Sequence, residues 1–204
     1  MIVEYDIEPI RGLPGNLPAG EKILWQGSPN ALRMAIHAFH VRAIAIYFAL
    51  LAGLGVIQAA RGAGTWIGCA ITLGVGLLAL AVVSLIAWGS ARTTVYTLTN
   101  RRIVMRFGIA LPKCINLPLG VIAAADLSKQ GKDIGDIALR LTEKQRLGWL
   151  QLWPHARPWA LAEAQPMLRS IPEVENVAGL LVRTISAAQG TPANVKAPVL
   201  AVAA

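Results

Sequence analysis

Two histidines, His37 and His40, are the residues of this chain best suited to hold a metal ion, because neutral imidazole is a good metal ligand. On a helix they share one polar stripe with Arg33, which stands four residues before His37. No cysteine or carboxylate lies close by in the sequence. We therefore favour a different interpretation, in which both histidines lie at a membrane surface and extend toward lipid headgroups. His155 is isolated and is expected to be structural or to face solvent.

Basic side chains form the second candidate site, and an anionic surface is their natural partner. The formal net charge of the 204 residues is +8, and most of the excess follows residue 92. Each basic group beside a bilayer contributes about 1 kcal/mol of attraction to anionic lipid. The same balance would suit nucleic acid, but no nucleic-acid motif is present, so we expect no such partner. The candidates for lipid or partner contact are Arg33, Arg42, Arg92, Arg101, Arg102, Arg106 and Trp159.

Catalytic chemistry is not expected from this inventory of residues. The sequence shows no Ser/His/Asp set, no glycine-rich phosphate loop and no cluster with metal-ligand spacing. A transporter would carry ionisable groups within its membrane spans, and none is found there. We therefore predict a protein that is not an enzyme and that has no resident cofactor.

The element that must position these residues is a pair of apolar segments at 43–60 and 66–88, within a hairpin of residues 43–91. As helices they would be roughly 27 and 35 Å long, enough to cross a hydrocarbon core of about 30 Å. A buried pair of soluble helices is the alternative, but neither segment has a polar face. Lys and Arg are concentrated outside the short connection, which predicts that both termini lie in the cytoplasm.

Small residues recur every fourth position in both spans, which lets helices approach closely. We favour packing within the hairpin; docking of a partner's transmembrane helix, or self-association to a homodimer, is the alternative. The two stripes are Ala45, Ala49 and Gly53 in the first span, and Gly68, Thr72 and Gly76 in the second.

The remaining chain divides around this hairpin. Residues 1–20 are rich in Pro and Gly and predict an extended arm, and residues 187–204 predict a disordered tail. Residues 21–42 predict a strand followed by a helix, which begins at Ser28 and Pro29 and runs continuously into the membrane. Residues 92–186 predict a small cytoplasmic domain.

Alternating apolar residues predict that this domain is rich in strands. Hairpins are expected at 94–107 and at 136–153, with strand material at 115–127, and Trp149 and Trp153 in the core. A capping box at 170–173 predicts a closing helix whose apolar face carries Val174, Val177, Leu181 and Ile185. The fold class is therefore an α+β membrane protein: a two-helix transmembrane hairpin plus a small β-barrel or sandwich closed by a C-terminal helix.

Several segments resemble the bacterial pleckstrin-homology-like (PH-like) domain attached to a membrane hairpin. They are EKILWQG at 21–27, YTLTNRRIVMRFG at 96–108 and PEVENVAGLL at 172–181. A closer resemblance is to the PuhB family of photosynthetic-complex assembly proteins of purple bacteria. It is carried by residues 8–27, by FHVRAIAIYF at 39–48, by RPW at 157–159 and by QPMLRSIP at 165–172.

The PuhB resemblance implies a non-enzymatic assembly factor in the bacterial inner membrane. Its expected partners are reaction-centre subunits and, less directly, polypeptides of the light-harvesting 1 antenna. Two alternatives remain open. The protein is a general PH-like module that binds lipid or protein, or it carries bacteriochlorophyll on His37 and His40.

Overall fold

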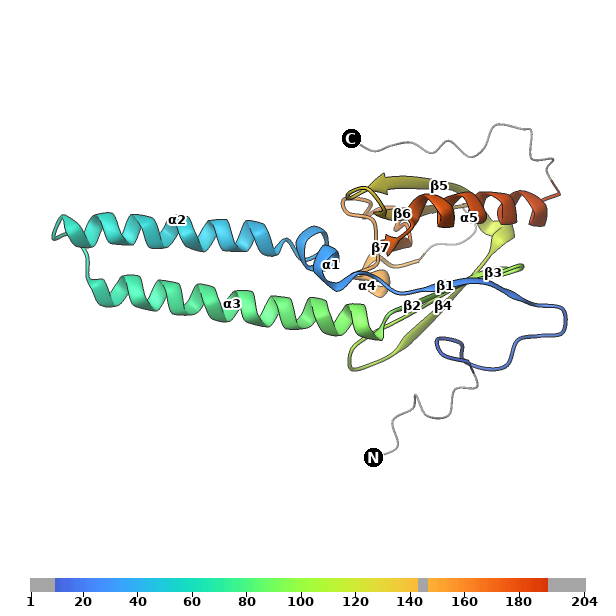
Figure 1. Ribbon diagram of the computed structural model, residues 1–204, viewed down its shortest axis with the longest axis horizontal. Helices are drawn as coiled ribbons and strands as arrows, with labels where there is room; N and C mark the ends of the chain where they lie inside the picture. The colour runs from blue at the N-terminus through green and yellow to red at the C-terminus, as the bar shows by residue number, and fades with distance from the viewer. Residues whose placement is uncertain (1–9, 143–146, 191–204) are drawn as a thin grey trace, which may run out of the picture. The chain divides into compact units, whose positions relative to one another are not determined.

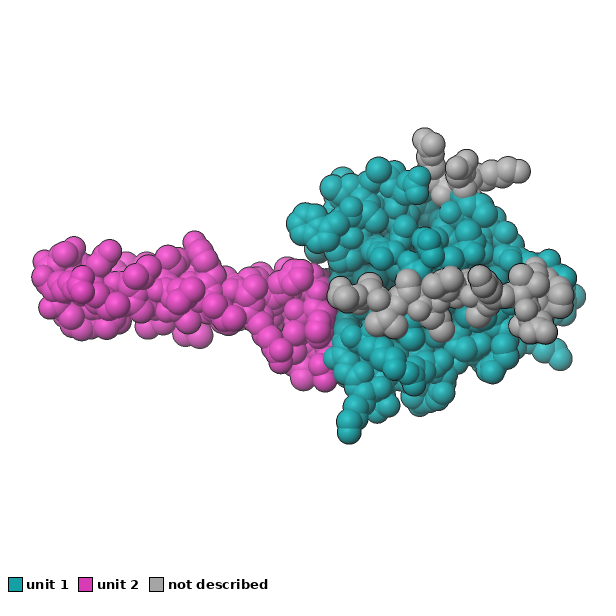
Figure 2. Space-filling model, turned by 90° about the horizontal axis from the view of Figure 1, so that it is seen from above, with its two compact units in different colours: residues 1–30, 90–204 teal, residues 31–89 magenta. Residues whose placement is uncertain are grey.

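The computed structural model describes residues 10–142 and 147–190, and it shows an α+β protein (Figure 1). The chain forms two compact units. Residues 31–89 make one of them, and residues 1–30 together with 90–204 make the other (Figure 2). The segment that precedes the helical hairpin therefore belongs to the same unit as the chain that follows it.

The unit of residues 31–89 is a helical hairpin. It contains α1 (Ala31–His37), α2 (Val41–Ala60) and all but the last turn of α3 (Trp66–Thr93). Both α2 and α3 are long and apolar enough to cross a membrane, and most of their residues are not buried. The connection turns at Gly62, whose φ of 72° lies in the left-handed region that glycine adopts readily.

The helix before the first span is not continuous, so that prediction was wrong. α1 ends at His37, and the N–H groups of Ala38 and Phe39 both donate to the carbonyl of Met34, at 2.8 and 3.2 Å. His40 then adopts a left-handed conformation with φ 52°, and α2 starts at Val41. The closing of the last turn of α1 onto one carbonyl, followed by a left-handed residue, is what ends the helix.

The other unit contains two antiparallel sheets. The first has the order β1 (Ile23–Gly27), β2 (Val95–Thr99), β3 (Arg102–Phe107), β4 (Lys113–Pro118), and the second has the order β5 (Ile122–Lys129), β6 (Ile134–Leu141), β7 (Met167–Pro172). A 3-10 turn, η2 (Leu119–Val121), connects them. The two sheets and α5 (Val174–Ala188) are distinct elements of this unit in Figure 1.

The core lies between the sheets and α5. The predicted apolar face of β3 is buried through Ile103, Met105 and Phe107. The closing helix contributes the four predicted residues, Val174, Val177, Leu181 and Ile185, to the same cluster. The predicted fold class, with two long apolar helices, a small sheet-rich domain and a closing helix, is confirmed by this arrangement.

Three local predictions in this unit were wrong. The expected strand at 148–153 is instead the short helix α4 (Trp149–Leu152), because β6 pairs with β5 and β7. Trp153 is half exposed rather than buried in the core, and Trp149 is only partly buried. Ser170 does not cap a helix, because it lies in β7 and its N–H donates to Asp136.

The two chain ends fall partly outside the described residues. The described part of the predicted arm packs onto the sheet-rich unit, since Leu13 is buried and Gly12 lies directly against Val95 at the start of β2. Of the predicted tail, only residues 187–190 are described, and the first two of them continue α5.

Candidate functional site

A hydrogen-bonded polar centre lies buried in the sheet-rich unit around His155. Its ring lies 4.7 Å from that of Phe107, centroid to centroid, and 5.6 Å from that of Tyr96. Nδ1 of His155 is 2.7 Å from the Tyr96 hydroxyl, and Nε2 is 3.1 Å from Oγ1 of Thr94. All three polar side chains are fully buried. The centre joins the start of β2 to the loop that follows α4.

The hydrogen bonds of this centre form a chain in which each group accepts from one neighbour and donates to the next. The N–H of Arg169 in β7 donates to the Tyr96 hydroxyl oxygen at 3.1 Å, and Thr94 donates to the carbonyl of Ser90 at 2.7 Å. Both hydroxyl groups are then satisfied only if Tyr96 donates to Nδ1 of His155 and Nε2–H of His155 donates to Thr94. We assign the Nε2–H tautomer on that ground. The chain of bonds ties the last turn of α3 to both sheets.

The charge state of His155 follows from its burial. Burial and, secondly, the positive charge of Arg169 together lower the pKa of His155 to about 3. Burial likewise raises the pKa of Tyr96. At neutral pH both side chains are uncharged and enclosed. The centre is therefore a fixed structural junction and is not placed to act as a general acid or base.

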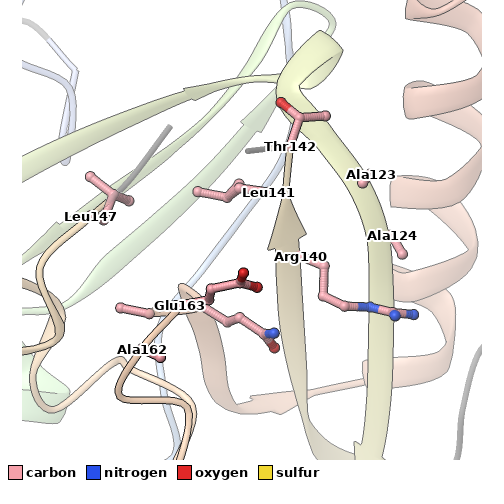
Figure 3. A pocket seen from close by; sticks show the side chains of 10 residues that line it. Ala123, Ala124, Arg140, Leu141, Thr142, Leu147, Ala162 and Glu163 are labelled. Atoms are coloured by element: carbon pink, nitrogen blue, oxygen red, sulfur yellow. The ribbon is translucent and has the colours of Figure 1, made fainter. Parts of the chain in front are cut away.

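An open groove of about 500 Å³ lies on another part of this unit. In Figure 3, Leu147 and Ala162 line one side of it, and Ala123 and Ala124 line the other. Its remaining lining residues are Arg140, Leu141, Thr142, Glu163, Ala164 and Gln165. The lining combines small apolar side chains with polar and charged ones, and the groove is open. Such a groove suits a segment of another polypeptide better than a buried small molecule.

An ion-pair network fixes the polar side of the groove. Asp126 accepts from Arg140 at 3.0 Å and from Arg157 at 2.8 Å, and Arg157 also donates to Gln165 at 2.9 Å. Asp126 is itself buried. The paired guanidinium groups are thus held in place by one carboxylate.

The predicted basic candidates are divided between the two units and differ in exposure. Arg102 is bound to Glu21 through two bonds of 2.9 and 3.1 Å. Although burial of Glu21 acts to raise its pKa, the hydrogen bonds from Arg102 and Thr99 outweigh it and the pKa is lowered. Arg106 is only 5% exposed within β3, so the structure does not present it to a lipid surface.

The other four basic candidates, Arg33, Arg42, Arg92 and Arg101, lie on or next to different elements. Arg101 is exposed in the turn between β2 and β3, and Arg92 is exposed in the last turn of α3. Arg42 is exposed at the start of α2, and Arg33 is partly buried in α1. Their role in lipid contact stays a prediction.

The two histidines proposed as ligands are separated by the helix break. His37 is the last residue of α1, and His40 is the left-handed residue before α2. They do not share one face of a single helix, which removes the geometric reason for a joint site. Within the described residues no group of three His, Cys, Asp or Glu side chains is arranged to hold a metal ion.

The candidate small residues divide between the inside and the outside of the hairpin. A β-carbon added at Gly76 would lie 2.8 Å from Phe48 of α2, so Gly76 lies where the two helices are in close contact. Gly68 and Thr72 are partly buried, and so is Ala45. Ala49 and Gly53 are exposed on the outer side of α2. The stripe of the first span is therefore not the seam of the hairpin.

Trp159 is the most exposed of the candidate residues in the sheet-rich unit. Its side chain is 95% exposed, and its φ of 63° places it in a left-handed turn. The strand-like pairing of Arg157 with Gln165, at 2.9 Å between N and O, holds the loop that carries it. The loop therefore holds this tryptophan in an exposed position, and its role in partner contact stays a prediction.

Comparison with known families accounts for this architecture. Residues 39–185 match the model of the bacterial PH domain family. The chain belongs to the bacterial PH domain family. It is also 36% identical over 200 residues to an uncharacterized 23.7 kDa protein in the puhA 5' region of Rhodobacter capsulatus. That alignment covers 96% of this chain and 94% of the relative, and it is consistent with the PuhB family. No solved structure matches the chain.

The family assignment confirms the predicted PH-like domain, but the buried centre was missed. His155 has no neighbour in sequence that marks it, and Tyr96 lies 59 positions away. The same holds for the groove, because Asp126 and Arg157 are 31 positions apart. One local signal in the sequence could have pointed to this loop. It is the segment Arg157, Pro158 and Trp159 followed closely by Gln165, whose side chain accepts a hydrogen bond from Arg157.

Proposed function

We propose that this protein is a non-enzymatic assembly factor for the photosynthetic reaction centre of a purple bacterium and, less directly, for its light-harvesting 1 antenna. The observation that carries the proposal is the relative whose name places it in the puhA 5' region, aligned over nearly the whole of both chains. A PH domain joined to two apolar helices supports it, because such a protein can bind other polypeptides at a membrane surface.

The proposed location is the bacterial inner membrane, with both termini in the cytoplasm. The outer surfaces of α2 and α3 carry large apolar side chains such as Leu50, Leu54, Ile71 and Leu78. Water is a poor solvent for a continuous surface of that kind. Trp66 and Trp88 lie near the two ends of α3, where tryptophan favours the membrane–water interface.

The proposed mechanism needs binding alone. The hairpin would contact apolar helices of reaction-centre or light-harvesting 1 polypeptides, and the sheet-rich unit would contact their cytoplasmic segments through the groove and Trp159. A factor that binds the partial assembly more tightly than the finished one is released as assembly proceeds. Anionic lipid and a second copy of the chain are further proposed partners.

The geometry of the buried centre supports a non-enzymatic role. His155 has the side chain best suited to acid–base chemistry in this unit, yet it is enclosed and uncharged at neutral pH. Arg140, which lines the groove, is bound in an ion pair to the buried Asp126.

Deletion of the gene tests the proposal. We expect assembled reaction centre, measured by its absorption in isolated membranes, to fall while transcripts of the subunits stay at the parental level. Complementation with Trp159→Ala should restore less of the complex than complementation with Leu24→Ala, which truncates an exposed leucine on β1. Normal levels of assembled complex in the deletion strain would contradict the proposal.

A pull-down in mild detergent from photosynthetically grown cells provides the second test. Reaction-centre or antenna polypeptides should co-purify with the full chain. Recovery of lipid alone would instead favour a general lipid-binding PH module. Bacteriochlorophyll absorption in the purified protein, lost in His37→Ala or His40→Ala, would favour a pigment carrier.

A further inference from the structure

Exposed apolar side chains gather around the start of β2, which follows α3 after a single residue. We call Ile109, Leu111, Leu150 and Trp153 the apolar rim. They are 53, 77, 81 and 50% exposed. They come from two segments that lie far apart in sequence: the loop between β3 and β4, and the helix α4 together with the residue that follows it.

Strand register places the first segment. Val95, the first residue of β2, pairs with Arg106, and Phe107 pairs with Lys113. The loop at 108–112 therefore lies at the end of the sheet where β2 begins. The last turn of α3, from Ser90 onward, belongs to the same compact unit.

The buried centre places the second segment. His155, two residues after Trp153, lies 3.1 Å from Oγ1 of Thr94, and its ring centroid is 4.7 Å from that of Phe107, with the two rings tilted. Thr94 is the residue between α3 and β2, and Phe107 is the last residue before the loop at 108–112. Both parts of the apolar rim are thus anchored to the same few residues.

The loop at 108–112 has an unusual composition for an exposed turn. Turn tips normally carry Gly, Asn, Asp, Ser or Pro, whereas this tip is Ile109, Ala110 and Leu111. Its tight closure is provided by Gly108, which has φ 128° and lies against the carbonyl of Leu111. Glycine thus supplies the turn, and the tip is free to carry apolar side chains.

The length of α3 beyond Trp88 sets the distance between the membrane interface and the start of β2. Thr93 lies five residues beyond Trp88, a rise of about 7.5 Å along a helix. The headgroup layer of one leaflet is roughly 5–8 Å thick. If Trp88 marks the interface, the start of β2 lies at the outer boundary of the headgroups, within reach of short projecting loops.

We propose that the apolar rim inserts into the headgroup–acyl boundary of the leaflet from which α3 emerges and so holds the PH-like domain against the bilayer. The inference rests on the proposed membrane-spanning hairpin. Lipid is favoured as the occupant because the rim is flanked by the exposed basic residues Arg92 and Lys113 and combines them with a tryptophan. The contact adds an apolar attachment to the two helices.

Depth-dependent fluorescence quenching tests the insertion. The full chain carrying Cys69→Ala and Cys114→Ser receives one new cysteine, labelled with an environment-sensitive dye, and is reconstituted into vesicles of phosphatidylglycerol and phosphatidylcholine. Leu111→Cys and Leu150→Cys report on the apolar rim. An inserted apolar face is buried about 5–10 Å deep. Lipids with a spin label near the headgroup should therefore quench the dyes at positions 111 and 150 at least about twofold more than a dye at an exposed control position.

Two control positions make the outcome decisive. Leu24→Cys is a matched exposed leucine in β1, beside the opposite end of β2, where Trp25 pairs with Leu98. Leu78→Cys near the middle of α3, measured with lipids that carry the spin label at the end of the acyl chain, reports whether the hairpin itself lies in the bilayer. We expect quenching at positions 78, 111 and 150 and little at position 24.

Three other results would each overturn the inference, and they can be told apart. Quenching at position 78 alone, with positions 111 and 150 behaving like position 24, refutes insertion while the membrane anchor stands. No quenching at position 78 refutes the anchor and the inference together. Dye shifts at 111 and 150 that depend on protein density and not on the spin-labelled lipid would assign the rim to a second copy of the chain.

Discussion

The helical hairpin and the sheet-rich unit place large and small side chains in opposite ways. In the hairpin, residues such as Leu54 and Leu78 face outward, while Ala52 and Gly76 are buried. In the sheet-rich unit, Phe107 and Ile137 are buried. Small residues let the two helices approach closely, whereas large ones fill the space between sheets. The proposed location accounts for this difference, because it places the hairpin in lipid and most of the domain in water.

The two units also differ in how they treat polar groups. The span of α3 has no charged side chain between Trp66 and Trp88. The domain instead encloses His155, Tyr96 and Arg169 in its interior and satisfies most of their polar atoms through hydrogen bonds. A buried network of this kind is specific to one arrangement of the chain, because each partner is costly to leave unpaired.

The strongest expected effect is a loss of domain stability in acid. The pKa of His155 is about 3 in the folded protein, below its ordinary value of 6.5. The folded state favours the neutral ring, whereas the unfolded state binds a proton already below pH 6.5. The contribution of His155 to the stability of the folded domain is therefore fully present above pH 6.5 and is lost as the pH falls toward 3. The full shift corresponds to a change in the free energy of unfolding on the order of 5 kcal/mol.

Urea unfolding of the detergent-solubilised chain at several pH values measures this effect. Carboxyl groups contribute to acid unfolding of any protein, so His155→Gln serves as the reference. The variant should be less stable at pH 7 and should lose less additional stability between pH 6.5 and 4. Parallel pH profiles for the two proteins would show that His155 does not titrate on unfolding.

A charge in the middle of α3 should have the next largest effect. Leu78→Arg places an arginine on the outer surface of the span, which costs about 2.5–3.5 kcal/mol in a bilayer. We expect a marked loss of protein from the alkali-washed membrane fraction. Leu24→Arg, on exposed β1, should leave that fraction unchanged. If both variants integrate equally well, the outer surface of α3 does not face lipid.

Removal of one hydroxyl from the buried centre should have an intermediate effect. Tyr96→Phe leaves Nδ1 of His155 and the N–H of Arg169 without their partner, at a cost of about 1–3 kcal/mol. The midpoint of urea unfolding followed by near-UV circular dichroism measures it. Tyr47→Phe changes an exposed residue of α2 and should leave the domain transition in place. An unchanged midpoint for Tyr96→Phe would contradict the hydrogen-bond assignment.

The smallest effect is expected in the seam of the hairpin. A β-carbon at Gly76 would meet Phe48 at 2.8 Å, close to its backbone, whereas nothing lies within 4 Å of one at Gly74. Gly76→Ala should therefore destabilise the hairpin by about 1 kcal/mol, and Gly74→Ala should not. Thermal unfolding in detergent, followed by helical circular dichroism, compares them. Equal effects of the two substitutions would mean that the seam does not pass through Gly76.

Much of the fold was predictable because its signals are local. The spans at 43–60 and 66–88 are defined by an uninterrupted run of apolar residues, which requires no knowledge of neighbours. The β3 strand and the apolar face of α5 follow from periods of two and of about four residues. The alternation of apolar and polar residues at 148–153 led to the wrong prediction of a strand. A pattern of only about four or five residues also fits the single helical turn that α4 forms.

The sequence by itself determined the composition of each surface: an apolar pair of helices, a basic sheet-rich domain and a closing amphipathic helix. The tertiary structure alone decided which distant residues meet. It paired β1 with β2 across the whole hairpin, enclosed His155 between Tyr96 and Thr94, and neutralised Arg102 with Glu21. The physical reason is that burial and hydrogen bonding depend on contacts between residues tens of positions apart, and no local pattern in the chain records those contacts.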